Sequence, residues 1–260
     1  MSTTTVNYTL EEAASLIADV NGFDPIAEAE ELLAKTNNSS EFNVLLTRRV
    51  NQHEPVAYIT KHAKFRGLDL YIDERVLIPR TETEPLVEIA VSECPSEVSL
   101  VDVGAGSGAV SLAVKNERHD LSILGVDISK DALDVASINS VNLELDVDWK
   151  DADLLEGVKG DFYCVLANLP YLPTTKRDSY APEMVEHEPQ VALWGGSDGF
   201  DLTRRLLAQV QPRKSVRLIA LEVGIGQELD VTELIRSSGF PTVFCVTDKK
   251  NDIRAAIGKR

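Results

Sequence analysis

The feature that most constrains the fold is a unit of strand, glycine loop, helix and second strand between residues 100 and 127. The apolar residues 100–103 lead into Gly104-Ala105-Gly106-Ser107-Gly108, and apolar residues at helical spacing follow. A second apolar run begins at Ser122 and ends on Asp127. Glycines at such a turn allow positive φ and let a ligand approach the backbone closely. Alternation of strands and helices from residue 99 onward predicts an open, doubly wound α/β sheet.

The same unit indicates the kind of cofactor. Asp127 lies about 20 residues beyond the loop, where a carboxylate can accept hydrogen bonds from two ribose hydroxyls. The loop reads Gly-x-Gly-x-Gly rather than Gly-x-Gly-x-x-Gly, and Asp102 lies in the strand before it. A pyrophosphate would be repelled by that acid, whereas a cationic cofactor would be attracted. S-adenosylmethionine, which carries a ribose, a sulfonium and an ammonium group, fits both facts, and NAD is the alternative.

Two further strands bring polar residues to the same edge. Asp153 follows a short strand within residues 147–155 and is placed to meet an adenine amino group, although a solvated loop carboxylate is an alternative. The apolar residues 162–166 deliver Asn168 to the carboxyl edge, where ligands bind in open α/β sheets. The predicted cofactor-binding residues are Gly104, Ala105, Gly106, Ser107, Gly108, Asp127, Ile128, Asp153, Leu154 and Asn168.

The loop Asn168-Leu169-Pro170-Tyr171 suits the binding of a planar amino group. The Asn168 side-chain oxygen can accept one N–H, the neighbouring backbone carbonyls can accept another, and the Tyr171 ring can cover the flat face of the group that carries the nitrogen. An ordinary strand-ending turn is the alternative, because Asn and Pro are common turn formers. We therefore predict that Asn168, Leu169, Pro170 and Tyr171 bind the substrate, with Asn168 and Tyr171 catalytic.

Ahead of the sheet, the sequence predicts three short amphipathic helices. Thr9, Asp24 and Ser39 mark their starts, and apolar residues recur at helical spacing up to Asn21-Gly22, residue 34 and residue 50. Residues 65–72 then alternate apolar and polar side chains, which predicts one arm of a hairpin. Helices this short bury little area alone, so we expect them to dock on the rest of the chain or to present a face to a partner. A purely structural cap is the alternative.

Composition narrows the classes of partner. Asp and Glu number 42 against 26 Lys and Arg, giving a formal charge of -16, so a basic face that would bind nucleic acid through phosphates is not expected. Cys94, Cys164 and Cys245 are too few and too far apart for a disulfide framework or a cysteine zinc site, and we predict no metal. Met1-Ser2-Thr3-Thr4-Thr5 lacks the pattern of a secretory signal, and no apolar run approaches the roughly 20 residues that span a bilayer. We expect a reducing, cytoplasmic setting without membrane contact.

Several segments together resemble the PrmC/HemK family, the glutamine methyltransferases that modify peptide chain release factors. The segments are Glu54-Pro55-Val56-Ala57-Tyr58-Ile59, Leu77-Ile78-Pro79-Arg80 with Glu82 and Glu84, residues 102–108, the Asn-x-Pro-Tyr loop, Glu188-Pro189 with Ala192-Leu193 and Gly195-Gly196, and Leu221-Glu222-Val223-Gly224 with Gln227. The resemblance covers nearly the whole chain.

The resemblance implies a class I S-adenosylmethionine-dependent methyltransferase: a Rossmann-like, seven-stranded, mostly parallel sheet with a small helical N-terminal domain and a linking β-hairpin. We place the helical substrate-recognition domain at residues 1–54, the hairpin linker at 55–76 and the methyltransferase domain at 77–260. The implied substrate is the glutamine of the Gly-Gly-Gln tripeptide in class 1 release factors, whose methylation supports translation termination. We expect a monomer that makes no direct contact with nucleic acid.

Two positions depart from the family pattern. Leu169 replaces the first proline of Asn-Pro-Pro-Tyr, and Thr81 replaces the proline of Pro-Glu-Thr-Glu. Leu169 keeps its carbonyl but loosens φ, which predicts a modest loss of preorganisation. Asn-Leu-Pro-Tyr also occurs in the rRNA dimethyladenosine methyltransferases, so an adenine amino-group methyltransferase acting on rRNA or DNA is an alternative, with Tyr171 stacked on a flipped base. A protein that binds the cofactor without catalysis is another. The acidity and the helical N-terminal segment argue against RNA.

Overall fold

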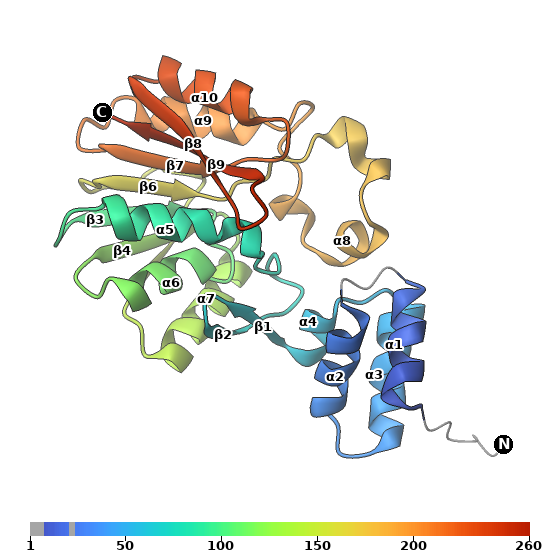
Figure 1. Ribbon diagram of the computed structural model, residues 1–260. Coiled ribbons are helices and arrows are strands. Elements are labelled where there is room, and N and C mark those ends of the chain that lie inside the picture. Colours follow the sequence, from blue (N-terminus) through green and yellow to red (C-terminus); the bar gives the residue numbers. More distant parts are fainter. Residues whose placement is uncertain (1–7, 21–23) are drawn as a thin grey trace.

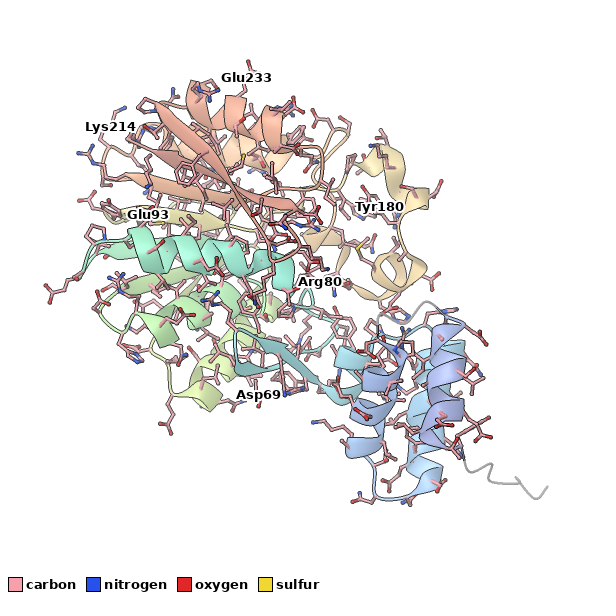
Figure 2. All side chains as sticks on the ribbon, viewed as in Figure 1. Asp69, Arg80, Glu93, Tyr180, Lys214 and Glu233 are labelled. Atoms are coloured by element: carbon pink, nitrogen blue, oxygen red, sulfur yellow. The ribbon has the colours of Figure 1, made fainter. Side chains whose placement is uncertain are left out.

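A computed structural model describes residues 8–20 and 24–260 of the chain. They form a helical module, a two-stranded hairpin and a seven-stranded sheet covered by helices on both faces (Figure 1). The segment Met1-Ser2-Thr3-Thr4-Thr5 and the predicted helix stop at Asn21-Gly22 lie outside the described residues. Exposed charged side chains such as Lys214 and Glu233 point outward from the sheet domain (Figure 2).

The predicted N-terminal helices are confirmed, and each begins at a side-chain cap. They are α1 (Leu10–Ala18), α2 (Pro25–Ala34) and α3 (Ser39–Asn51). Thr9 forms a capping box with Glu12, Asp24 accepts from the N–H of Ala27, and Asn38 rather than Ser39 caps α3. Such caps satisfy backbone donors that a helix leaves unpaired at its start.

A fourth, shorter helix belongs to the same module. The stretch α4 (Val56–Thr60) follows α3, and its Val56 and Ile59 join the apolar core of the helical module. The buried members of this core are Ala13, Ala14, Ile17, Ala29, Leu32, Phe42, Leu46, Val56 and Ile59. The start of the predicted hairpin linker is therefore helical and packs with the helices before it.

The hairpin itself is shorter than the sequence pattern predicts. Strands β1 (His62–Phe65) and β2 (Leu68–Tyr71) pair antiparallel across Arg66-Gly67, both with positive φ of 46° and 81°. Residues 65–72 were predicted as one arm, which is wrong, because the run contains the turn and the whole second strand. A two-residue hairpin turn of type I′ needs positive φ at both central residues, and Gly67 is the sequence signal for it.

The large sheet has the strand order β5-β4-β3-β6-β7-β9-β8. Its strands are β3 (Ser99–Val103), β4 (Ser122–Asp127), β5 (Asp148–Asp151), β6 (Cys164–Ala167), β7 (Leu218–Glu222), β8 (Thr242–Thr247) and β9 (Ile253–Lys259). The first five pair in parallel, and β9 runs antiparallel to both β7 and β8. This is the mostly parallel, seven-stranded sheet that the family resemblance implies.

Helices cover both faces of this sheet (Figure 1). On one face lie α5 (Glu84–Glu93), which continues a short turn η1 (Thr81–Thr83), α6 (Ala109–Glu117) and α7 (Lys130–Leu143); on the other lie α9 (Asp201–Val210) and α10 (Glu228–Ser237). Among the described residues, no helix combines the length and apolarity needed to cross a bilayer. From β3 the chain adds β4 and β5 on one side of the sheet, and it then adds β6 and β7 on the other side of β3. In such sheets a ligand crevice opens beyond the carboxyl ends of the strands where the order switches, here between β3 and β6.

A long connection between β6 and α9 contains elements that the sequence did not indicate. It holds η2 (Thr174–Ser179), α8 (Pro182–His187) and η3 (Gln190–Ala192), and Tyr180 lies on its outer side (Figure 2). We call residues 171–196 the β6–α9 connection. The guanidinium of Arg49 in α3 pairs with Glu28 at 2.6 Å and with Glu183 of α8 at 3.2 Å. The imidazole of His187 also bonds the Gln52 carbonyl at 2.7 Å, so the connection is tied to the helical module.

Candidate active site

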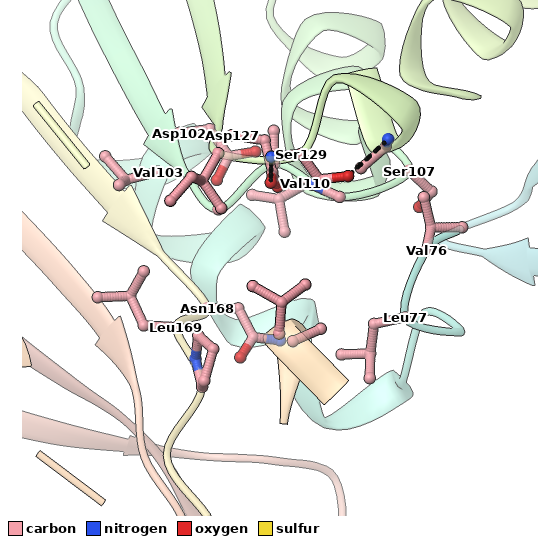
Figure 3. Close-up of a pocket in the computed structure, with 18 of the residues that line it drawn as sticks. Val76, Leu77, Asp102, Val103, Ser107, Val110, Asp127, Ser129, Asn168 and Leu169 are labelled. Carbon is pink, nitrogen blue, oxygen red and sulfur yellow. Dashed lines mark hydrogen bonds between the residues drawn. The ribbon is translucent and has the colours of Figure 1, made fainter. Parts of the chain in front are cut away.

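A cavity opens at the carboxyl edge of the sheet, where the loops after β3, β4, β5 and β6 meet (Figure 3). The predicted site residues that line it are Gly104, Ala105, Gly106, Ser107, Asp127, Ile128, Asp153, Leu154, Asn168, Leu169 and Pro170. The structure thus brings most of the predicted set to one place. Gly108 and Tyr171 are not among the lining residues.

The glycine loop meets two different requirements. Gly104, Gly106 and Gly108 all have positive φ. A Cβ added at Gly106 would meet nothing within 4 Å, so this backbone faces open space that a ligand can occupy. A Cβ at Gly108 would instead lie 2.8 Å from the Trp149 ring. Packing under the loop therefore explains Gly108, while at Gly106 only the positive φ requires glycine and the space beside it is open.

Asp127 binds the glycine loop at the end of β4. Its Oδ2 accepts from the Gly106 N–H at 2.8 Å, and its Oδ1 accepts from the Ser129 N–H at 2.9 Å. Burial raises the pKa of this carboxyl above its ordinary value, although the two backbone donors oppose that rise. A carboxylate has about four lone-pair directions, so it can accept from ribose hydroxyls in addition to backbone N–H groups.

Asp102 lies beneath the cavity and is only 2% exposed. Its Oδ2 accepts from both the N–H and the hydroxyl of Ser111, at 3.1 and 2.7 Å. Burial raises the pKa of Asp102 to about 6, and the neighbouring Asp127 contributes to the rise. Two carboxyls therefore give this side of the cavity a negative character, which favours a cation.

Asp153 lies in the turn after β5 and faces the guanidinium of Arg205, a partner that the sequence did not predict. Its Oδ2 pairs with the guanidinium of Arg205 in α9 at 2.7 Å. Arg205 lies more than fifty positions after Asp153 in the sequence, so no local pattern links the two residues. The contact between Asp153 and an adenine amino group stays a prediction.

Asn168 follows β6 and faces the cavity across from Asp127 and Ser129 (Figure 3). Its Nδ2 donates to the Thr83 hydroxyl at 3.2 Å, which leaves the side-chain oxygen available to a ligand. A Cβ at Gly104 would stand 3.4 Å from the Asn168 carbonyl, so the loops after β3 and β6 lie close together. Thr83 was not predicted, because nothing in the sequence links it to Asn168.

Tyr171 takes a different position from the one expected for a residue that covers a substrate. Its hydroxyl interacts with the buried carboxyl of Glu222, and burial raises the pKa of the phenol well above its usual range. Its carbonyl accepts from the side chain of Gln227 at 2.9 Å. Glu222 could have been noticed in the sequence, since a carboxylate ending the apolar run of β7 is a buried polar group that needs an explanation.

Arg80 and Glu188 connect two segments of the family resemblance, Leu77-Ile78-Pro79-Arg80 and Glu188-Pro189. The Arg80 guanidinium bonds the Glu188 carboxylate, which also accepts from the Ile78 N–H at 3.2 Å. Glu188 is 3% exposed, and burial raises its pKa. The pair holds Pro189, Val191 and Ala192 of the β6–α9 connection at the edge of the cavity.

Comparisons with known proteins agree with this geometry. The family model for the methyltransferase small domain matches residues 83–219. A release factor glutamine methyltransferase of Agrobacterium fabrum is 33% identical over 264 residues, which cover 96% of this chain and 90% of that protein. One of Caulobacter vibrioides is 35% identical, covering 96% of this chain and 86% of that protein.

Among solved structures, a methyltransferase from Pyrococcus furiosus superimposes with a TM-score of 0.56 at 16% identity, over 74% of this chain and 89% of that one. That likeness shows the fold, and the two bacterial relatives show the family. The chain therefore belongs to the family of release factor glutamine methyltransferases.

Proposed function

We propose that this enzyme transfers a methyl group from S-adenosylmethionine to the side-chain amide nitrogen of the glutamine in the Gly-Gly-Gln motif of class 1 peptide chain release factors. The observation that carries the proposal is the side chain of Asn168. Its amide N–H is bound to Thr83, and its oxygen is left for a donor in the cavity. A primary amide presents such donors, and relatives named for this reaction match nearly the whole chain.

The cavity fits the cofactor. Open space over Gly106, the paired backbone bonds of Asp127 and the buried Asp102 suit a ribose next to a cationic group. The residues that would hold it are Gly104, Ala105, Gly106, Ser107, Asp127, Ile128, Asp153 and Leu154. When bound, S-adenosylmethionine supplies the methyl group from a positively charged sulfur.

The residues after β6 would act by positioning and electrostatics. An amide nitrogen is a poor nucleophile, because its lone pair is delocalised into the carbonyl. The Asn168 side-chain oxygen and the Leu169 carbonyl accept the two N–H groups of the glutamine amide and so fix the direction of its nitrogen. As the nitrogen acquires positive charge, the same two oxygens stabilise it. Tyr171 would act indirectly, because it does not line the cavity and its hydroxyl interacts with Glu222.

The helical domain, which we assign to residues 1–54, would contribute to recognition of the release factor. Support comes from the bonds of Arg49 and of Gln52 to the β6–α9 connection, whose Pro189 and Ala192 border the cavity. The linker at residues 55–76, which contains α4 and the β1–β2 hairpin, would join this domain to the methyltransferase domain at 77–260. We propose a cytoplasmic monomer that makes no direct contact with nucleic acid, because its substrate is a translation factor and its charge is -16.

The test is transfer of labelled methyl from S-adenosylmethionine to a purified class 1 release factor. A release factor whose Gly-Gly-Gln glutamine is changed to alanine and a preparation of rRNA are assayed beside it. Label on the wild-type factor alone supports the proposal. Label on rRNA and not on the factor would support an adenine amino-group methyltransferase instead, and cofactor binding without transfer to any substrate would support a non-catalytic protein.

A further inference from the structure

Glu222 is a buried carboxyl that the proposed chemistry does not use directly. It ends the apolar strand β7, and the residue is 8% exposed. The hydroxyls of Thr83 and Tyr171 both interact with it, and within the described residues its Oε2 has no hydrogen-bond partner. Burying a carboxylate that is incompletely paired is unfavourable, so an apolar residue would serve the core better. Its presence requires another explanation.

Thr83 joins Glu222 to Asn168. A threonine hydroxyl has one hydrogen to donate and two lone pairs with which to accept. Its oxygen accepts from Nδ2 of Asn168 at 3.2 Å, and its hydroxyl interacts with the Glu222 carboxyl. The three side chains therefore form a chain of donors with one direction, from Asn168 through Thr83 to Glu222. An ionised carboxylate can only accept, and this fixes that direction.

We propose that Glu222 is a positioning residue that acts through Thr83 to hold the Asn168 amide with its oxygen toward the substrate. The inference rests on the proposed function, since an oxygen is needed there only if the substrate brings N–H groups. A neutral Glu222 carboxyl can donate to Thr83, whose hydrogen then turns to Asn168. That arrangement favours the flipped amide, which would present N–H groups to the N–H groups of the glutamine.

The groups around Glu222 place its titration near neutral pH. Burial raises the pKa of Glu222 to about 7, while Thr83, Tyr171 and the Arg254 guanidinium of β9 lower it and the charge of Glu82 raises it. The two charged neighbours have their own partners, Arg254 with Asp248 at 3.0 Å and Glu82 with Lys250 at 3.2 Å. Methyl transfer should therefore weaken as the pH falls through about 7, where the carboxyl gains its proton.

The test compares Thr83→Val with Thr83→Ser and adds Glu222→Gln. Valine has the shape of threonine without the hydroxyl, and serine keeps the hydroxyl. For each protein, kcat and KM for the release factor and the Kd for S-adenosylmethionine are measured from about pH 6 to about pH 9, a range that brackets the raised carboxyl pKa.

We expect Thr83→Val to lower kcat by roughly 10- to 100-fold, the effect of one misdirected hydrogen bond in a transition state, with the cofactor Kd within about threefold of the wild type. Thr83→Ser should keep most of the activity. Glu222→Gln should lower kcat roughly tenfold and lose the fall in kcat near pH 7, because a glutamine amide does not titrate.

A residue that merely supports the fold would not give this pattern. If Thr83→Val and Glu222→Gln keep the kcat and the pH profile of the wild type, the positioning role is overturned and the proposed function stands. Equal losses in the valine and serine variants would also overturn it. If the wild type binds the cofactor and transfers no methyl to the release factor, the proposed function fails, and this inference fails with it. Should Glu222→Gln not fold, the Thr83 pair decides the question alone.

Discussion

Asp127 at the end of β4 and Gly106 in the loop after β3 are joined by a 2.8 Å hydrogen bond, in which the glycine N–H donates to the carboxylate. The bond ties the ends of two neighbouring strands into one edge of the cavity. It also keeps the carboxylate directed at the space over the glycine loop, where a Cβ would meet nothing.

Replacing Asp127 with Ala should lower the affinity for S-adenosylmethionine by roughly 10²- to 10⁴-fold. The change removes the acceptors proposed for the two ribose hydroxyls, and hydrogen bonds to a charged group each contribute about 1.5–3 kcal/mol. Isothermal titration calorimetry gives the Kd directly. Asp134→Ala removes the same charge from an exposed position on α7 and serves as the control. Equal affinities in the two variants would remove Asp127 from the cofactor site.

Replacing Asn168 with Ala should abolish methyl transfer and leave cofactor affinity largely intact. The variant loses the side-chain oxygen proposed to accept the substrate N–H, while the loop after β3 keeps its backbone. Activity on the release factor and cofactor Kd are measured on the same preparation, with Asn142→Ala on the exposed side of α7 as the control. Full activity in the Asn168 variant would refute its assignment.

Replacing Leu169 with Pro restores the residue that the family pattern carries. Proline fixes φ near its ordinary value and retains the carbonyl, so the loop loses conformational freedom before the substrate arrives. We expect kcat to rise by roughly two- to fivefold. The Leu169 side chain is buried among apolar neighbours, so the melting temperature should fall at the same time. A decrease in kcat would mean that the loop already has its productive shape with leucine.

Replacing Asp102 with Asn should stabilise the protein at pH 8 by about 2 kcal/mol, because a buried carboxylate with a raised pKa weakens the folded state when it is ionised. The folded-state pKa of about 6 lies above the ordinary value, so the contribution of Asp102 to stability is greatest at low pH and is lost as the pH rises through 6. The gain should therefore fade between about pH 6 and pH 4. Urea unfolding of both proteins at several pH values measures it. The cofactor should bind more weakly to the variant, which lacks the negative charge.

Replacing Arg49 with Met should destabilise the protein by about 3 kcal/mol. The side chain is 1% exposed and pairs with Glu28 and Glu183, so the change removes a buried cation that faces both carboxylates. The control is Arg48→Met in the same helix, whose pair with Glu54 is partly exposed and should contribute about 1 kcal/mol or less. Chemical denaturation distinguishes the two. Equal effects would show that Arg49 is not a specific link between α3 and α8.

The parts of the fold that the sequence predicts are those governed by local patterns. Side-chain caps and helical spacing located α1, α2 and α3, and apolar runs located β3, β4 and β6. The β1–β2 turn was missed because a run of alternating residues hides a tight turn until Gly67 is read as a break. The β6–α9 connection was missed because its short helical turns depend on distant bonds such as Arg49 to Glu183.

In the candidate site too, local patterns predict some residues, and contacts between distant parts of the chain determine the others. Strand ends and glycines place Gly106, Asp127 and Asn168 at one edge, because all parallel strands of a sheet end on the same side. Side-chain partners from elsewhere in the chain have no such rule. Thr83, Arg205 and Glu222 reach the site by tertiary packing, and only a three-dimensional structure shows which residue each of them faces.

The central place of β6 has a consequence for motion. Every residue of β6 is buried, and its neighbours β3 and β7 pair with it on both sides, whereas the β6–α9 connection that follows is mostly at the surface. Amide hydrogens of β6 should exchange with solvent only on global unfolding, and those of the connection through small local openings. The border between slow and fast exchange should then fall just after Asn168. Local opening of the connection would therefore leave β6, and with it the position of Asn168, unchanged.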